Sequence, residues 1–181
     1  MVGSKRVIFL DRDGTINIDH GYVHRIEDWE FVSRAPEALK LLSSAGYTLA
    51  VVTNQAGVAD GRFPEAAVDK LHAHMQKSLV QECGTPIDAI AYCPHHRDAG
   101  CHCRKPNPGL AEQIEKVVGP IDYANSWMVG DKESDIGFGA NVGTKTALIT
   151  SSYWNPQSMK TNPDAIFDSL YDFAKTIKTE S

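Results

Sequence analysis

The sequence lacks a long apolar run, and it lacks an excess of basic residues. Its longest unbroken apolar stretch is the five-residue segment Ala89–Cys93, whereas a membrane-spanning helix needs about 20 residues. Lysine and arginine together number 18 against 23 aspartates and glutamates, which gives a formal net charge of −5. Dedicated nucleic-acid-binding domains usually carry a net basic charge. We therefore expect a cytoplasmic protein that binds neither membranes nor nucleic acids.

Cysteine is also scarce, and its four copies are unevenly placed. Secreted disulfide frameworks usually spread their cysteines along the chain, but three of these four fall within eleven positions, with a histidine among them. A tight Cys/His cluster outside a secreted framework indicates a metal site rather than free thiols. Three thiolates and one imidazole fill all four positions of tetrahedral Zn²⁺ and leave none for water. The sequence therefore predicts a structural zinc site formed by Cys93, His95, Cys101 and Cys103.

Strand-like and helix-like segments alternate along the chain, without internal repeats. Short apolar or β-branched segments predict strands at residues 7–10, 48–53, 87–92, 127–129 and 146–150. Helical spacing of apolar residues, together with proline and glycine at segment ends, predicts helices at residues 35–45, 64–81, 109–118, 132–140 and 169–178. Because the strands are apolar throughout, they predict a parallel sheet covered by helices on both faces. Ligands of such folds bind beyond the carboxyl ends of the strands.

Acidic residues follow the first and fourth predicted strands. Asp11 and Asp13 belong to the sequence Asp-Arg-Asp-Gly-Thr, in which Gly14 lets the backbone bend. Asp131 and Asp135 follow the fourth strand and are spaced to share one face of a helix that starts there. Buried carboxylates are costly when unpaired, and a hard cation is a natural partner for them. Each pair, taken alone, could also be a loop or helix-capping feature.

Polar and basic residues follow the second and third predicted strands. Thr53 and Asn54 offer a hydroxyl and an amide, which suit phosphate oxygens. Arg104 and Lys105 precede two prolines, which stiffen the segment and hold Lys105 as a point charge. An ordinary polar turn would explain either motif on its own, so the signal lies in the order of all four motifs.

In that order, the four motifs resemble those of the haloacid dehalogenase (HAD) superfamily, over residues 7–150. The resemblance implies an α/β fold, a HAD-like Rossmannoid three-layer sandwich with a central parallel sheet and no large cap domain. We expect one domain over residues 1–181, with a flap at residues 16–31 and a zinc loop at residues 93–103. Because a dehalogenase has no use for a second aspartate as an acid, Asp13 favours a phosphatase.

The resemblance also implies a role for each motif. Asp11 would attack phosphorus to form an aspartyl-phosphate, and Asp13 would protonate the leaving oxygen and later activate water. Catalytic Mg²⁺ would be bound by the carboxylates of Asp11 and Asp131 and by the carbonyl of Asp13. Asp135 would orient Asp131 or Lys105 from behind. The phosphoryl oxygens would be held by Thr53, Asn54 and Lys105.

Two phosphatase families within the superfamily are similar to this chain. Residues 11–24, 51–59 and 93–96 resemble the D-glycero-D-manno-heptose 1,7-bisphosphate 7-phosphatases, which supply ADP- or GDP-heptose for lipopolysaccharide or related glycans. The five-residue gap between His95 and Cys101 is instead similar to the histidinol-phosphate phosphatases. Arg104 is the candidate for a second phosphate, which a small phosphorylated sugar such as a heptose bisphosphate carries and histidinol phosphate lacks.

A third alternative is a HAD-like module that binds phosphorylated ligands without turning them over. Loss of Asp11 or Asp13 would favour that alternative, and the sequence contains both. A phosphotransferase differs only in its acceptor, so the sequence does not separate it from a phosphatase. We expect a monomer, because no apolar helix stripe calls for a dimer.

Overall fold

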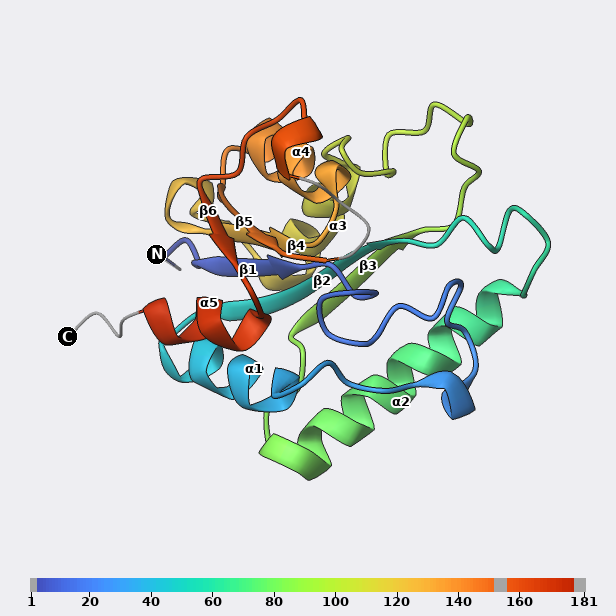
Figure 1. Ribbon diagram of the computed structural model, residues 1–181, viewed down its shortest axis with the longest axis horizontal. Helices are drawn as coiled ribbons and strands as arrows, with labels where there is room; N and C mark the ends of the chain where they lie inside the picture. The colour runs from blue at the N-terminus through green and yellow to red at the C-terminus, as the bar shows by residue number, and fades with distance from the viewer. Residues whose placement is uncertain (1–2, 152–155, 178–181) are drawn as a thin grey trace.

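A sheet of six strands forms the centre of the computed structural model, which describes residues 3–151 and 156–177 (Figure 1). The strands are β1 (Val7–Leu10), β2 (Thr48–Asn54), β3 (Ala89–Cys93), β4 (Trp127–Gly130), β5 (Lys145–Ile149) and β6 (Ala165–Phe167). The α-helices are α1 (Ala35–Ser44), α2 (Glu65–Cys83), α3 (Gly109–Val118), α4 (Glu133–Val142) and α5 (Leu170–Thr176). Short 3₁₀ helices lie at Ile26–Asp28, Tyr123–Asn125 and Pro156–Ser158.

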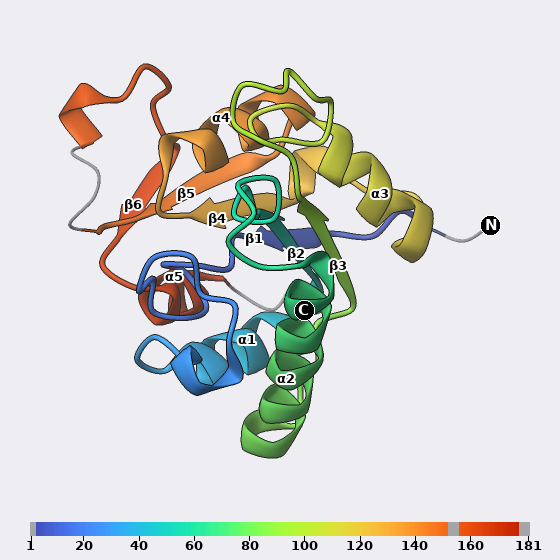
Figure 2. The ribbon, with the colours of Figure 1, turned by 90° about the vertical axis from the view of Figure 1, so that its right-hand side faces the viewer.

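The strand order is β3-β2-β1-β4-β5-β6, and every neighbouring pair is parallel. Figures 1 and 2 show α1, α2 and α5 on one side of the sheet and α3 and α4 on the other. From β1 to β5, each connection between successive strands contains one α-helix, and none contains a large cap domain. The predicted three-layer fold around a parallel sheet is therefore confirmed.

Alternate residues of each central strand pack into two separate cores. In β1, Ile8 and Leu10 join the core formed with α1, α2 and α5, while Val7 and Phe9 join the core formed with α3 and α4. All four side chains are fully buried. This two-sided burial explains why the strand is apolar at every position instead of alternating.

The chain reverses direction across the sheet between β1 and β4. It runs outward from β1 to β3 and returns to place β4 beside β1, with Leu10 next to Val129 in the register. Such a switch point leaves a crevice at the carboxyl ends of the two strands. Residues that follow Leu10 and Gly130 therefore meet, although they are far apart in the chain.

Several predicted element ends shift by one or two residues, and two differences are informative. Strand β6 was not predicted, because it has only three residues at the sheet edge and Ile166 is half exposed, so its apolar signal is short. Helix α4 begins at Glu133, and Lys132 is its N-cap. The carboxylate of Asp135 accepts a hydrogen bond from the Lys132 backbone N–H, so Asp135 caps this helix and Asp131 does not.

The segment between β1 and α1 folds back over the carboxyl end of the sheet. Asn17 forms an isolated bridge with Phe31, and the Ile18 N–H donates to the carbonyl of Glu30. These contacts close residues 16–31 into a loop whose tip reaches the crevice, at the place where the flap was predicted. Among the described helices, none combines the length and apolarity that a bilayer crossing requires.

Candidate active site

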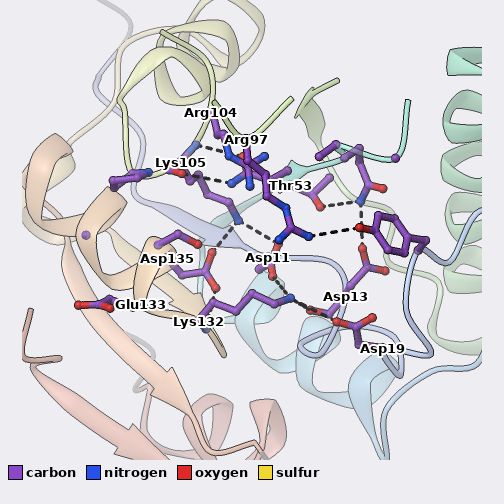
Figure 3. Close-up of a pocket in the computed structure, with 18 of the residues that line it drawn as sticks. Asp11, Asp13, Asp19, Thr53, Arg97, Arg104, Lys105, Lys132, Glu133 and Asp135 are labelled. Carbon is purple, nitrogen blue, oxygen red and sulfur yellow. Dashed lines mark hydrogen bonds and ion pairs between the residues drawn. The ribbon is translucent and has the colours of Figure 1, made fainter. Parts of the chain in front are cut away.

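The carboxyl ends of β1, β2 and β4 open into a pocket of about 810 Å³ (Figure 3). Its lining includes residues from all four predicted motifs, namely Asp11, Asp13, Thr53, Asn54, Arg104, Lys105 and Asp135. Asp131 lies directly behind this lining and is fully buried. The structure therefore brings the predicted site residues together, as the parallel strand order requires.

Lys105 lies between two buried carboxylates (Figure 3). Its Nζ donates to Asp11 Oδ1 at 2.9 Å, to Asp135 Oδ1 at 2.6 Å and to the Val52 carbonyl at 2.7 Å. Burial alone would raise the pKa of Asp11, but the ammonium groups of Lys105 and Lys132 outweigh it, so the pKa lies below its ordinary value. Asp11 is thus a carboxylate near neutral pH, which is the form that can act as a nucleophile.

Asp131 is a buried carboxylate with neither oxygen hydrogen-bonded to any described residue. Burial, and then the charge of Asp11, raises its pKa to about 7. Asp11, Asp131 and Asp135 each offer an oxygen within 4.8 Å of the others. A Cβ at Gly14 would clash with the Asp131 carboxylate, so glycine there keeps the space open. Buried carboxylate oxygens that lack hydrogen bonds and face other carboxylates fit a divalent cation.

Lys132 adds a second ammonium group to this cluster. Its Nζ lies 3.3 Å from the Asp13 carbonyl, 3.7 Å from Asp11 Oδ2 and 3.6 Å from Asp131 Oδ1. It also reaches Asp19 Oδ2 on the flap at 3.4 Å. Burial by itself would lower the pKa of Lys132. The surrounding carboxylates raise the pKa by more than burial lowers it, so the side chain stays charged. The sequence analysis gave Lys132 no role, although its place next to Asp131 was the available signal.

The Asp13 carboxylate is held on the flap side of the pocket by three neighbours. Arg12 Nη2 donates to both oxygens at 3.0 Å, and the amides of Asn17 and Gln55 each donate at 3.0 Å. Gln55 also donates to Thr53 Oγ1 at 2.9 Å. The sequence analysis missed Arg12, Asn17 and Gln55, because nothing in the local pattern shows which way their side chains turn.

Asn54 and Arg104 lie differently from each other, although both were predicted to bind substrate. The Asn54 amide exchanges two hydrogen bonds with the Lys105 backbone, accepting from its N–H at 3.0 Å and donating to its carbonyl at 3.2 Å. Asn54 therefore positions the Lys105 loop, and phosphate binding by Asn54 stays a prediction. Arg104 lines the pocket, and its buried Nη1 has no hydrogen-bond partner among the described residues. Such a cation suits an anionic ligand group.

The four predicted zinc ligands converge in the loop that follows β3. Cys93 Sγ lies 3.5 Å from both Cys101 Sγ and His95 Nδ1, and Cys103 Sγ lies 3.7 Å from Cys101 Sγ and 3.1 Å from His95 Nδ1. All four cysteines of the chain are free thiols. Ligand separations of this size match the edges of a tetrahedron around Zn²⁺ with Zn–S bonds of about 2.3 Å. The cluster therefore fits a zinc ion and leads directly into Arg104.

Comparisons with known proteins agree with this geometry. A HAD-hydrolase-like family model matches residues 102–173. The D-glycero-beta-D-manno-heptose-1,7-bisphosphate 7-phosphatase of Escherichia coli K12 is 41% identical over 189 residues, covering 99% of this chain and 97% of the relative. The chain belongs to this phosphatase family. The enzyme of the same name from Haemophilus ducreyi is 44% identical over 151 residues, or 80% of this chain and 82% of that relative.

A solved structure extends the family match to three dimensions. The D,D-heptose 1,7-bisphosphate phosphatase from B. bronchiseptica, complexed with magnesium and phosphate, is 31% identical, with a TM-score of 0.85. The match covers 94% of this chain and 97% of that one. The predicted membership of the HAD-like hydrolases and the predicted similarity to heptose bisphosphate phosphatases are therefore confirmed.

Proposed function

We propose that this chain removes the C7 phosphate of D-glycero-D-manno-heptose 1,7-bisphosphate in the biosynthesis of ADP- or GDP-heptose. The observation that carries the proposal is the Asp11–Lys105–Asp135 cluster beside Asp13, in a chain that matches heptose bisphosphate 7-phosphatases almost end to end. A non-catalytic module would not need to keep a charged nucleophile and a second, separately held carboxylate in one pocket.

The first chemical step is assigned to Asp11. A carboxylate oxygen of Asp11 attacks phosphorus and forms a new O–P bond, while the bond from phosphorus to the C7 oxygen breaks. Asp13 donates a proton to the departing oxygen, which leaves as an alcohol. In the second step, Asp13 accepts a proton from water, and that water releases phosphate from Asp11. Lys105 offsets negative charge beside Asp11 throughout.

Two metals complete the proposal. Asp11, Asp131 and the Asp13 carbonyl would hold Mg²⁺, since Asp131 has buried oxygens without hydrogen-bond partners. Mg²⁺ supplies charge neutralisation between the carboxylates and the phosphate. The Cys/His cluster would hold Zn²⁺ as a structural ion that shapes the loop before Arg104 and Lys105. Magnesium and phosphate in the B. bronchiseptica enzyme support the first assignment.

Arg104 is proposed to bind the phosphate at the far end of the sugar. Arg104 lines the same pocket as Asp11, its buried Nη1 has no hydrogen-bond partner among the described residues, and a bisphosphate offers a second anionic group to this cation. Histidinol phosphate has an amine in place of that group, so Arg104 favours the bisphosphate. Thr53 and Lys105 are proposed to hold the phosphate that reacts.

The deciding experiment measures phosphate release with Mg²⁺ from heptose 1,7-bisphosphate and histidinol phosphate in parallel. We expect kcat/KM to be at least a hundredfold higher for the heptose, or about 2.7 kcal/mol of transition-state discrimination. A reversed preference would show that the short zinc loop sets specificity and would overturn the proposal. No turnover of either substrate would favour the non-catalytic module.

A further inference from the structure

We propose that His72, on α2, is a positioning residue for the general acid Asp13 and acts through the buried guanidinium of Arg12. The inference rests on the role proposed above for Asp13. His72 is not among the residues that line the pocket, so it does not touch the substrate. Figure 1 shows α2 running beside the loop that follows β1, and this packing brings the two segments together.

Arg12 connects the helix to the acid. Its side chain is fully buried, with Nη2 on both oxygens of Asp13 at 3.0 Å and Nε on one of them at 3.2 Å. Nη2 also donates to the Val23 carbonyl at 2.7 Å on the flap. The remaining nitrogen, Nη1, lies 3.2 Å from His72 Nε2. The guanidinium is thus fixed between Asp13, the flap and α2.

The contact with Arg12 fixes the protonation state of His72. A guanidinium has only donors, so His72 Nε2 must accept and the ring must be neutral, with its proton on Nδ1. Burial, and then the charge of Arg12, lowers the pKa of His72 to about 4, and the carboxylates of Asp13 and Asp69 oppose this shift. A neutral acceptor is therefore present throughout the pH range in which the enzyme would work.

A second contact holds the His72 ring in place. The ring packs edge-on against Tyr92, with centroids 5.6 Å apart. The Tyr92 hydroxyl lies 3.1 Å from a Glu65 oxygen and 3.0 Å from an Asp69 oxygen, so it can donate its single proton to either, and both are on the same helix as His72. The acceptor is thus fixed in position, as a group that orients another side chain should be.

Loss of the acceptor has a specific consequence for Asp13. An unpaired N–H of a buried guanidinium is costly, so Arg12 would shift toward other acceptors. Asn17 and Gln55 would still hold Asp13, but without the paired donors of Arg12. Proton transfer is sensitive to misplacement of the acid on the scale of an ångström. The proton-dependent step should therefore slow, while attack by Asp11 should not.

The test compares substrates whose leaving groups differ in their need for a proton. A sugar alkoxide must be protonated as it leaves, whereas p-nitrophenolate leaves without help. Because kcat/KM reports steps up to leaving-group departure, it excludes the later hydrolysis of the aspartyl-phosphate. We expect His72→Phe to lower kcat/KM about tenfold for the heptose bisphosphate and less than about twofold for p-nitrophenyl phosphate.

Two variants control for structural effects. His72→Gln restores an acceptor oxygen and should stay within about threefold of the parent on both substrates, whereas His72→Leu, which has no acceptor, should repeat the bias. This pair decides the question if His72→Phe folds poorly. His74→Phe changes a half-buried histidine two positions along, which lies near Trp29 and Ser78, and should show no bias.

Asp13→Asn tests the acid role of Asp13 separately from the positioning role of His72. We expect it to lower kcat/KM for the heptose bisphosphate about a hundredfold and to affect p-nitrophenyl phosphate much less. Without that bias, the acid role of Asp13 is wrong. If Asp13→Asn shows the bias while the variants of His72 without an acceptor lower both substrates equally or neither, then His72 is a packing residue and the inference is overturned.

Discussion

The two clusters of candidate metal ligands are built in opposite ways. The carboxylate cluster of Asp11, Asp131 and Asp135 is fully or nearly fully buried and comes from the ends of β1 and β4 and the first turn of α4. The thiol cluster lies within residues 93–103, and only Cys93, at the end of β3, is buried in the core. The sheet holds the first cluster, whereas the second belongs to a loop in which Cys101 and Cys103 are only partly buried against the core.

The difference predicts how each cluster responds to the loss of its ion. Strand pairing between β1 and β4 fixes the backbone around Asp11 and Asp131 whether or not a cation is bound. Residues 95–100 of the loop that carries the thiol cluster are exposed, so most of their order should come from coordination of an ion. Loss of the cation from the carboxylate cluster should therefore abolish catalysis without unfolding the protein. Loss of an ion from the thiol cluster should lower the stability of the protein more.

Replacement of the nucleophile should give the largest effect. We expect Asp11→Asn to reduce turnover at least about a thousandfold, because an amide cannot form the aspartyl-phosphate. The fold should persist, since Lys105 keeps its contacts with Asp135 and Val52. Phosphate release and thermal melting of the purified variant measure both parts. Retained activity would remove Asp11 as the nucleophile.

Removal of zinc should give the largest effect on stability. Chelation with EDTA, followed by replenishment of Mg²⁺, should lower the melting temperature by about 5 °C or more. Cys101→Ser should do the same, whereas Cys83→Ser, whose thiol donates to the carbonyls of Leu79 and Thr85, is the control outside the cluster. Metal analysis must confirm the loss. An unchanged melting temperature after verified zinc removal would contradict a structural role.

The buried, neutral state of His72 should appear as a pH dependence of the protein's stability. His72 has a pKa of about 4 in the fold against an ordinary value of 6.5, so the unfolded chain binds more protons between these values. The contribution of neutral His72 to the free energy of unfolding is complete above pH 6.5 and is lost as the pH falls from 6.5 toward 4. Between pH 7 and pH 5 the free energy of unfolding should drop by about 2 kcal/mol more in the parent than in His72→Gln.

Urea titrations at the two pH values measure this difference directly. Other titrating groups contribute equally to both proteins, so the comparison isolates His72. An identical pH dependence in the parent and in His72→Gln would mean that the histidine is not held neutral by its surroundings.

The smallest predicted effect concerns the residue between the two clusters. Arg104 follows Cys103 and lines the pocket, and its buried Nη1 has no hydrogen-bond partner among the described residues. We expect Arg104→Ala to raise KM for the bisphosphate about tenfold, through loss of a charge-assisted contact, and to change KM for a heptose 7-monophosphate much less. An equal effect on both substrates would contradict binding of the distal phosphate.

Much of this arrangement was predictable because the main signals are local. Continuous apolar segments indicated buried strands, and the motifs after them indicated the edge at which the site forms, since parallel strands share that edge. The Cys/His cluster was predictable for a different reason, as its four members lie within eleven positions of the chain.

Other parts of the site depend on contacts between elements, which local patterns do not show. Asn17 and Gln55 hold Asp13 only because the flap and the β2–α2 loop fold toward it. In the sequence, His72 looks like an ordinary histidine of a helix. Its contact with Arg12 exists because α2 packs beside the loop after β1. The lack of hydrogen bonds to the buried Asp131 oxygens, among the described residues, can be recognised only from the tertiary structure.

By itself, then, the sequence determined the fold class, the edge of the sheet that carries the site, and the carboxylates, lysine and thiols that gather there. These follow from residue type and spacing along one strand, one turn or one loop. Only the tertiary structure decided how those groups are charged and held. Lys105 lies between Asp11 and Asp135, and a buried histidine can accept from Arg12, because burial and pairing depend on segments far apart in the chain.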